Sequence, residues 1–117
     1  MVELITLDHA IETYGLPNYI KIDVEGFELP VVRGLSKAVA LVSFECNLPM
    51  FRDETVEAIF TLGNLSAQAC FNWMAADGHS LASPAWLCAD QMIETVRSNR
   101  AGYLEIFCST RPLREVS

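Results

Sequence analysis

The sequence predicts an α/β fold in which short helices alternate with the strands of one mostly parallel sheet. Two apolar runs, one with β-branched positions at 18–24 and one nearly continuous at 38–46, flank a short helical segment, which is the pattern of a βαβ unit. The second run carries one charge in nine residues, as in parallel strands that are buried on both faces. No repeat or linker composition interrupts residues 1–117, so we predict a single domain.

The remaining elements follow from apolar spacing and turn residues. Thr6 can cap a first helix, and Gly15 is a natural end for it. A later helix is predicted to begin at Asp53 and to place Val56, Ile59, Phe60 and Gly63 along one side. In chain order the prediction is a helix over 6–15, a strand over 18–24, a short helix within 26–37, a strand over 38–46, a helix from 53, a strand over 67–75, an irregular loop over 75–88, a helix over 89–99 and a strand over 102–109.

Composition and charge exclude several classes of function. The chain is 51% hydrophobic and 20% charged, which is ordinary for a soluble globular protein. Its formal net charge of −7 argues against a nucleic-acid partner, because such binding depends on Lys and Arg. We expect no membrane partner, because no apolar run approaches the ~20 residues that a spanning helix needs. The N-terminus also lacks the pattern of a signal peptide.

The four cysteines show no metal-binding pattern. Cys46, Cys70, Cys88 and Cys108 are far apart in sequence, without CxxC or Cys/His spacing. Three of them lie in apolar runs, where a free cysteine behaves as a small hydrophobic residue. We therefore expect no metal site here and a cytoplasmic location.

Carboxylates stand where two predicted strands end. Asp23 closes "YIKID", Glu45 closes "LVSFE", and Glu25 and Asn47 follow them. If the two strands are neighbours, about 4.8 Å apart, these side chains converge at the carboxyl edge of the sheet, where open α/β sheets bind ligands. The alternative is a solvated turn, and for Glu28 we favour a role at the start of the following helix.

The stretch "TLDHAIETYGLPNYIKIDVEGFELPVVRGLS" resembles the C-terminal core of the FkbM family of methyltransferases, which use S-adenosylmethionine, so residues 1–117 resemble the C-terminal half of that domain. The family pattern is a Thr-Leu-Asp before a short helix and an Ile-Lys-Ile-Asp-Val-Glu-Gly strand end. Residues 6–8 and 20–26 match it closely. The later stretches "VSFECNLP", "FNW", "PAWL" and "GYLEIFCST" also look like this family.

The resemblance implies part of a class I, Rossmann-like methyltransferase sheet in which "GYLEIFC" is an antiparallel strand inserted between its neighbours. It implies O-methylation of a small-molecule or glycan hydroxyl, with Asp23, Glu25 and Glu45 as catalytic residues and Asn47 as a substrate-binding residue. Asp23 would also border the cofactor. In a variant, Asp23, Glu45 and Asn47 hold a divalent cation that polarises the acceptor oxygen.

The same resemblance implies that the glycine-rich cofactor loop of such enzymes would precede residue 1. We therefore expect a fragment, one half of a split enzyme or a truncated relative, in which "YIKID" is an unpaired sheet edge. Such an edge predicts a homo-oligomer or a complementary N-terminal half as partner. The alternative function is a non-catalytic interaction module or an inactive truncated remnant.

Overall fold

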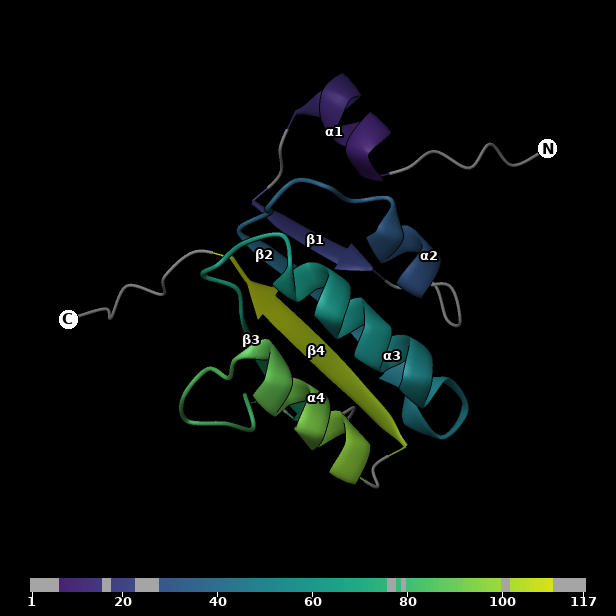
Figure 1. Ribbon diagram of the computed structural model, residues 1–117, viewed down its shortest axis with the longest axis vertical. Helices are drawn as coiled ribbons and strands as arrows, with labels where there is room; N and C mark the ends of the chain where they lie inside the picture. Colours follow the sequence, from purple (N-terminus) through teal and green to yellow (C-terminus); the bar gives the residue numbers. More distant parts are fainter. Residues whose placement is uncertain are drawn as a thin grey trace.

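The strands form one four-stranded sheet in the order β1-β2-β4-β3, with helices packed against it (Figure 1). The structure is a computed structural model that describes residues 7–15, 18–22, 28–75, 78, 80–99 and 102–110. The described elements are α1 (Leu7–Tyr14), β1 (Tyr19–Ile22), α2 (Glu28–Arg33), β2 (Leu41–Asn47), α3 (Leu48–Gly63), β3 (Cys70–Ala75), α4 (Ala89–Ser98) and β4 (Tyr103–Ser109). A mixed α/β fold with this order of helices and strands is the one that the sequence predicts.

Within the described residues the sheet is mixed: two of the three strand pairings are antiparallel, although only β4 runs against the direction of the other three strands. β1 and β2 pair in parallel, with Ile22 opposite Phe44. β4 lies between β2 and β3 and pairs antiparallel with both. Because β4 lies inside the sheet and not at its edge, this one strand forms both antiparallel pairings.

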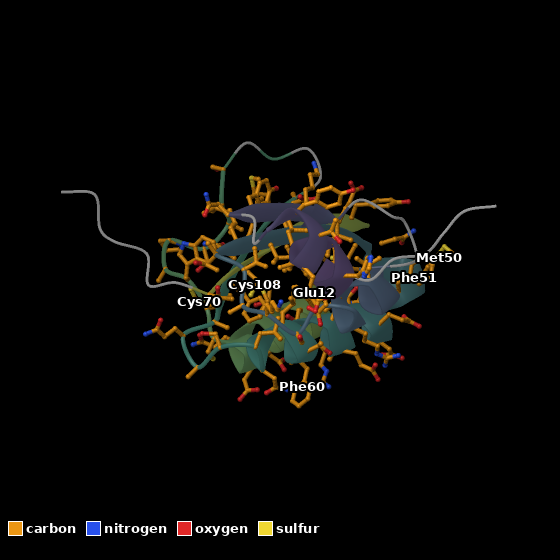
Figure 2. The ribbon with its side chains drawn as sticks, turned by 90° about the horizontal axis from the view of Figure 1, so that it is seen from above. Glu12, Met50, Phe51, Phe60, Cys70 and Cys108 are labelled. Carbon is orange, nitrogen blue, oxygen red and sulfur yellow. The ribbon has the colours of Figure 1, made fainter. Side chains whose placement is uncertain are left out.

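Alternation along β2 separates the two faces of the sheet. The even-numbered residues 42–46 are buried against α2 and α3, on the side that we call the helix face, where α4 packs against α3 and β3. The odd-numbered residues 41–47 point to the other side, which we call the open face because α2, α3 and α4 all lie opposite it (Figure 2). β2 is thus well buried on both faces along its first half and more exposed near its carboxyl end.

The helix face holds the hydrophobic core. Each large apolar side chain that folding buries there contributes about 1.5–3 kcal/mol. The largest fully buried side chains are Val32, Val39, Val42, Phe44, Leu48, Ile59, Leu62, Phe71, Met92, Val96, Leu104 and Ile106.

The Asp8 carboxylate connects α1 by hydrogen bonds to the turn that follows α2. The Asp8 side chain accepts hydrogen bonds from the backbone N of Ser36 at 2.7 Å and from the Ser36 hydroxyl at 2.6 Å. The backbone N of Asp8 donates to the carbonyl of Gly34 at 2.9 Å. At the other end, Gly15 has a φ of 94° and ends the helix, as the sequence predicts.

The Asp8 contact makes stability depend on pH. The hydrogen bonds from Ser36 lower the pKa of the Asp8 carboxyl from its ordinary value of 3.8, so the charged form stabilises the fold above that pH. This contribution is lost as the pH falls through the lower folded-state pKa. We expect Asp8→Asn to lower the thermal unfolding midpoint at neutral pH and to match the wild type in strong acid. Circular dichroism melts at both pH values test this, with Glu12→Gln on the same helix as a control without effect.

The helix α3 begins earlier than predicted. It starts at Leu48, directly after β2, with a proline in its first turn, and it contains a kink at Phe51, whose φ and ψ are −126° and 34°. The predicted start at Asp53 corresponds to the regular part after this kink. The buried side of this helix is also offset by about one residue from the predicted side. Its buried residues are Thr55, Ala58, Ile59 and Leu62. Phe60 is 61% exposed and points away from the sheet (Figure 2).

An arginine from the first half of α3 holds the end of α4. The Arg52 guanidinium donates to the carbonyl of Val96 and, at 2.9 Å, to the carbonyl of Asn99. The last carbonyls of a helix lack partners within it and carry partial negative charge, so a cation there stabilises the end. This contact fixes α4 beside α3 on the helix face.

The loop over 80–87 packs along β3 and partly covers the open face. Asn72, fully buried, donates from its amide to the carbonyl of Ser83 at 2.9 Å and accepts from the backbone N of Ser83 at 3.1 Å. Leu87 forms an antiparallel bridge with Phe71. The predicted irregular loop is therefore tied to the edge of the sheet by β-type hydrogen bonds.

The four cysteines are present as thiols, and their reactivities should differ. Burial raises the pKa of the Cys108 thiol to about 12, and burial also raises the pKa of the Cys70 thiol. Since the thiolate is the nucleophile, we expect a maleimide to label the exposed Cys88 first, Cys70 slowly, and the buried Cys46 and Cys108 after unfolding only. Mass spectrometry of labelled peptides measures the order, with urea-unfolded protein as the reference. Rapid labelling of Cys108 would contradict the packing of β4.

The helices of the described part of the chain include none that is both long enough and apolar enough to cross a bilayer.

Candidate functional site

The carboxyl ends of β1 and β2 meet at one edge of the sheet, together with the start of β4. Ile22, the last residue of β1, lies opposite Phe44, and β2 continues for three more residues to Asn47. This confirms that the strands expected to carry the site are neighbours. Asp23 and Glu25, two of the three predicted catalytic residues, lie outside the described residues. Their positions relative to β2 stay a prediction.

Glu45, the third predicted catalytic residue, lies on the open face near this edge. It is half-buried and stands directly opposite Glu105 of β4 in the antiparallel register. Side chains that are directly opposite in such a pair are neighbours, and two like charges there destabilise the sheet. Among the described residues, neither carboxylate has an ion-pair partner within 4.0 Å.

Asn47, the predicted substrate-binding residue, ends β2 one position before α3. It lies opposite Tyr103, and its Nδ2 donates to the Tyr103 hydroxyl oxygen at 3.2 Å. Asn47 occupies the N-cap position of α3 without a side-chain capping bond, although asparagine is a favoured capping residue. Instead the backbone N of Leu48 donates to the carbonyl of Gly102 at 3.0 Å. The Asn47 side chain is therefore directed to the open face by its neighbour across the sheet.

Apolar side chains follow this polar edge in the chain. Met50 is 71% exposed and Phe51 is half-buried, and both lie at the start of α3 (Figure 2). Thr55 donates its hydroxyl to the Phe51 carbonyl at 2.7 Å, which supports the backbone at the kink. The edge of the sheet thus combines carboxylate, amide and phenol groups with an exposed apolar residue beside them.

A cavity with a volume of about 450 Å³ lies farther along the open face. Its lining is mostly apolar, with two aromatic side chains, and the 80–87 loop forms one wall. Met74 at its rim lies directly opposite Glu105, so the cavity adjoins the pair of glutamates. The lining residues are Ala40, Leu41, Met74, Leu81, Trp86, Phe107 and Ser109.

The polar groups at the edge suit an acceptor hydroxyl. A carboxylate such as Glu45 can accept the hydroxyl proton, and an amide such as Asn47 can both donate and accept hydrogen bonds. Within the described ranges, no group of three or more His, Cys, Asp or Glu residues is placed to hold a metal ion. Of the predicted cation-binding set, Asp23 lies outside those ranges, so that prediction stays untested.

The sequence reasoning missed Tyr103 and Glu105. The stretch "GYLEIFC" shows alternation, which predicts a strand with Tyr103 and Glu105 on one side. What brings them to Asn47 and Glu45 is the antiparallel register with β2, which alternation does not reveal. The signal that could have found them is the predicted insertion of this strand beside β2.

Comparison with protein families identifies the domain. The pattern described as the methyltransferase FkbM domain matches residues 1–75, which is more than half of the chain. The chain belongs to the FkbM methyltransferase family. This confirms the resemblance of the N-terminal and central segments. No curated protein matches the chain.

The FkbM match covers only some of the residues of the candidate site. Glu45 and Asn47 fall inside it, as do Asp23 and Glu25, whereas β4 lies beyond residue 75. The stretches "PAWL" and "GYLEIFCST", which also look like the family, are not part of the match. Glu105 therefore lies outside the matched residues, and the pairing of β4 with β2 places it beside Glu45.

Proposed function

We propose that the chain is part of an S-adenosylmethionine-dependent methyltransferase that transfers a methyl group to the hydroxyl oxygen of a small molecule or glycan. Membership of the FkbM methyltransferase family supports methyl transfer in general. The observation that carries the site is that β1 and β2 are parallel neighbours, with Glu45 and Asn47 on the open face of β2 just beyond the level at which β1 ends.

The fold supports a class I, Rossmann-like arrangement. The antiparallel strand β4 is inserted between β2 and β3, which is the order that the family resemblance implies for the last strand of that fold. In such sheets ligands bind beyond the carboxyl ends of the parallel strands. We therefore assign the methyl-transfer site to the edge beyond Ile22 and Glu45.

Each predicted residue has a role in this site. Asp23 or Glu25 orients the acceptor hydroxyl, or deprotonates it if Glu45 does not, and Asp23 also borders the cofactor. Glu45 borders the reacting oxygen from β2, and Asn47 binds the acceptor, its amide held in place by Tyr103. S-adenosylmethionine supplies the electrophilic methyl group when it is bound. Positioning of the two reactants would provide much of the rate.

A second candidate is a non-catalytic interaction module. It is favoured by the free edge of β1, which pairs with β2 on one side and has no second strand beside it among the described residues. Tyr19 on this edge is 46% exposed. A complementary N-terminal half that carries a cofactor loop would pair there, in either the catalytic or the non-catalytic case.

Calorimetric titration with S-adenosylmethionine tests the proposal. Heat of binding at micromolar affinity supports the methyltransferase and rejects the non-catalytic module. Incubation with S-adenosylmethionine labelled in its methyl group, and with pools of sugars, polyols and hydroxylated lipids, then identifies the acceptor by transferred label. Absence of both binding and transfer, alone and with an N-terminal methyltransferase half added, would overturn the proposal. We further propose a cytoplasmic location, which the four thiols support.

A further inference from the structure

The apolar cavity on the open face has the size and the lining of a pocket for a small molecule. Its volume of about 450 Å³ lies within the range of roughly 300–1,000 Å³ that such pockets have. Leu41 of β2 and Phe107 of β4 form its floor, and Leu81 and Trp86 of the 80–87 loop form one wall. The helices α2, α3 and α4 pack on the other side of the sheet and leave this pocket uncovered (Figure 2).

Hydrogen bonds hold the wall of the cavity in place. Asn72, which lies directly opposite Phe107 in the sheet, bonds twice to Ser83 of the loop, at 2.9 Å and 3.1 Å. Farther along the loop, Leu87 and Phe71 exchange two backbone hydrogen bonds of 2.7 Å each. A wall fixed at both points gives a pocket that exists before the ligand binds, and this lowers the cost of binding.

The cavity lies beside the predicted catalytic carboxylate of β2. Phe107 in its floor is two residues from Glu105 on β4, and Glu105 stands directly opposite Glu45. Phe107 and Glu45 are therefore diagonal neighbours across an antiparallel pair, which places their backbones about 7–8 Å apart. Met74, also in the lining, is directly opposite Glu105 on its other side. A ligand in the cavity needs to extend only a few bonds to place a hydroxyl group at Glu45.

We propose that this cavity binds the body of the methyl acceptor, and that the acceptor is an uncharged, hydroxylated compound with about two or three apolar rings. This inference rests on the proposed methyltransferase function. The cavity has about three times the volume of a dry cavity of about 150 Å³ that binds benzene, which sets the number of rings.

The lining favours apolar rings over a free sugar. Among the described lining residues, Trp86 and Ser109 alone have a nitrogen or oxygen atom in the side chain. A sugar would bury several hydroxyl groups here without enough hydrogen-bond partners, which is costly. The aromatic rings of Trp86 and Phe107 instead provide apolar surface against which flat rings pack well.

The charges near the cavity favour an uncharged acceptor over an anion. Glu45 and Glu105 stand together beside it, and the whole chain has a formal net charge of −7. The described lining includes no residue of β1, the strand that carries Lys21. A carboxylate or phosphate on the acceptor would thus be repelled at the place where its hydroxyl must lie.

Calorimetric titration of the full chain without S-adenosylmethionine tests the proposal, with 2-naphthol as the probe. This compound has two apolar rings, one hydroxyl group and no charge, and it should bind with micromolar affinity. The control ligands are 2-naphthoate, which has the same rings with a carboxylate, and methyl glucoside. Both should bind at least about tenfold more weakly. Absence of 2-naphthol binding, or equal affinity for either control ligand, would overturn the proposal.

A charged variant locates the binding site. Leu81 in the wall is 40% exposed, so Leu81→Glu should fold normally and weaken 2-naphthol binding about tenfold or more, because its charge lies beside the apolar rings. Phe60→Glu adds the same charge on the far side of α3 and should bind like the wild type (Figure 2). Circular dichroism melts verify that both variants fold. Unchanged 2-naphthol affinity in Leu81→Glu contradicts the assignment to this cavity.

Rates of methyl transfer separate this inference from the proposed function. With methyl-labelled S-adenosylmethionine, kcat/KM for 2-naphthol should exceed that for methyl glucoside at least about tenfold. Equal transfer to both leaves the methyltransferase function intact and overturns the cavity assignment alone. Binding of 2-naphthol without methyl transfer to any acceptor, even with an N-terminal methyltransferase half added, overturns the methyltransferase function and with it the acceptor assignment.

Discussion

A Glu45→Gln variant is expected to bind S-adenosylmethionine as the wild type does and to lose about 10²- to 10⁴-fold in kcat with a hydroxyl acceptor. Glutamine has the same shape as glutamate and still accepts a hydrogen bond, so KM for the acceptor should change little. It does not accept the hydroxyl proton in the transition state. The expected pattern is therefore a loss in kcat with nearly unchanged KM.

The fold should survive this substitution. Glu45 faces Glu105 across the antiparallel pair, and removing one of two like charges relieves repulsion. The thermal unfolding midpoint of Glu45→Gln should therefore equal or exceed that of the wild type, and lost activity would not reflect unfolding. This expectation separates a chemical role from a structural one.

Initial rates with methyl-labelled S-adenosylmethionine and the acceptor found by screening provide the measurement. Glu94→Gln, on the exposed side of α4, is the matched control and should keep full activity. If Glu45→Gln retains kcat, Glu45 is not the proton acceptor, and that role passes to Asp23 or Glu25. Asn47→Ala should instead raise KM, because its amide is assigned to acceptor binding.

The sequence predicts much of the fold because turn residues and periodicity agree. The helix α4 and the strands β3 and β4 lie within the predicted ranges, since the segment between β3 and α4 contains an Asp-Gly pair and a proline that break both kinds of structure. α1 ends where predicted because Gly15 alone supplies the left-handed conformation there.

The start of α3 was mispredicted for a local reason. Asp53 is a favoured capping residue, and Pro49 is often read as a break before a helix. A proline is acceptable in the first turn, however, and the helix begins directly after Asn47 with a kink at Phe51. Within the regular part of the helix, Ala58 and Leu62 are fully buried, whereas Phe60, which was expected on the buried side, is exposed.

The candidate site was predictable in part. Apolar runs indicate the two neighbouring parallel strands, and their pairing places Glu45 and Asn47 beyond the level at which β1 ends. Tyr103 and Glu105 of β4 join the site only because β4 is the strand beside β2 and pairs with it in this register. Both depend on contacts between residues more than fifty positions apart, such as Asn47 and Tyr103, and local sequence patterns do not encode them.

A Phe44→Ala variant is expected to lose about 3–5 kcal/mol of unfolding free energy. Phe44 is fully buried on the helix face of β2, opposite Ile22 of β1 and Ile106 of β4. Removing its ring takes contacts from both neighbouring strands and leaves a cavity in the core. Since small domains have about 5–15 kcal/mol in total, this loss is a large fraction of the stability.

The chain offers a matched control with the same chemical change. Phe60 lies on α3 and is 61% exposed, so Phe60→Ala should cost at most about 0.5 kcal/mol. Urea unfolding followed by tryptophan fluorescence gives both values, and an unchanged m-value shows that stability alone has changed. Equal losses in the two variants would mean that the buried side of α3 is the one that the sequence predicted. A large loss in Phe44→Ala alone would show that packing beneath β2 holds the strand that presents Glu45 on the opposite face.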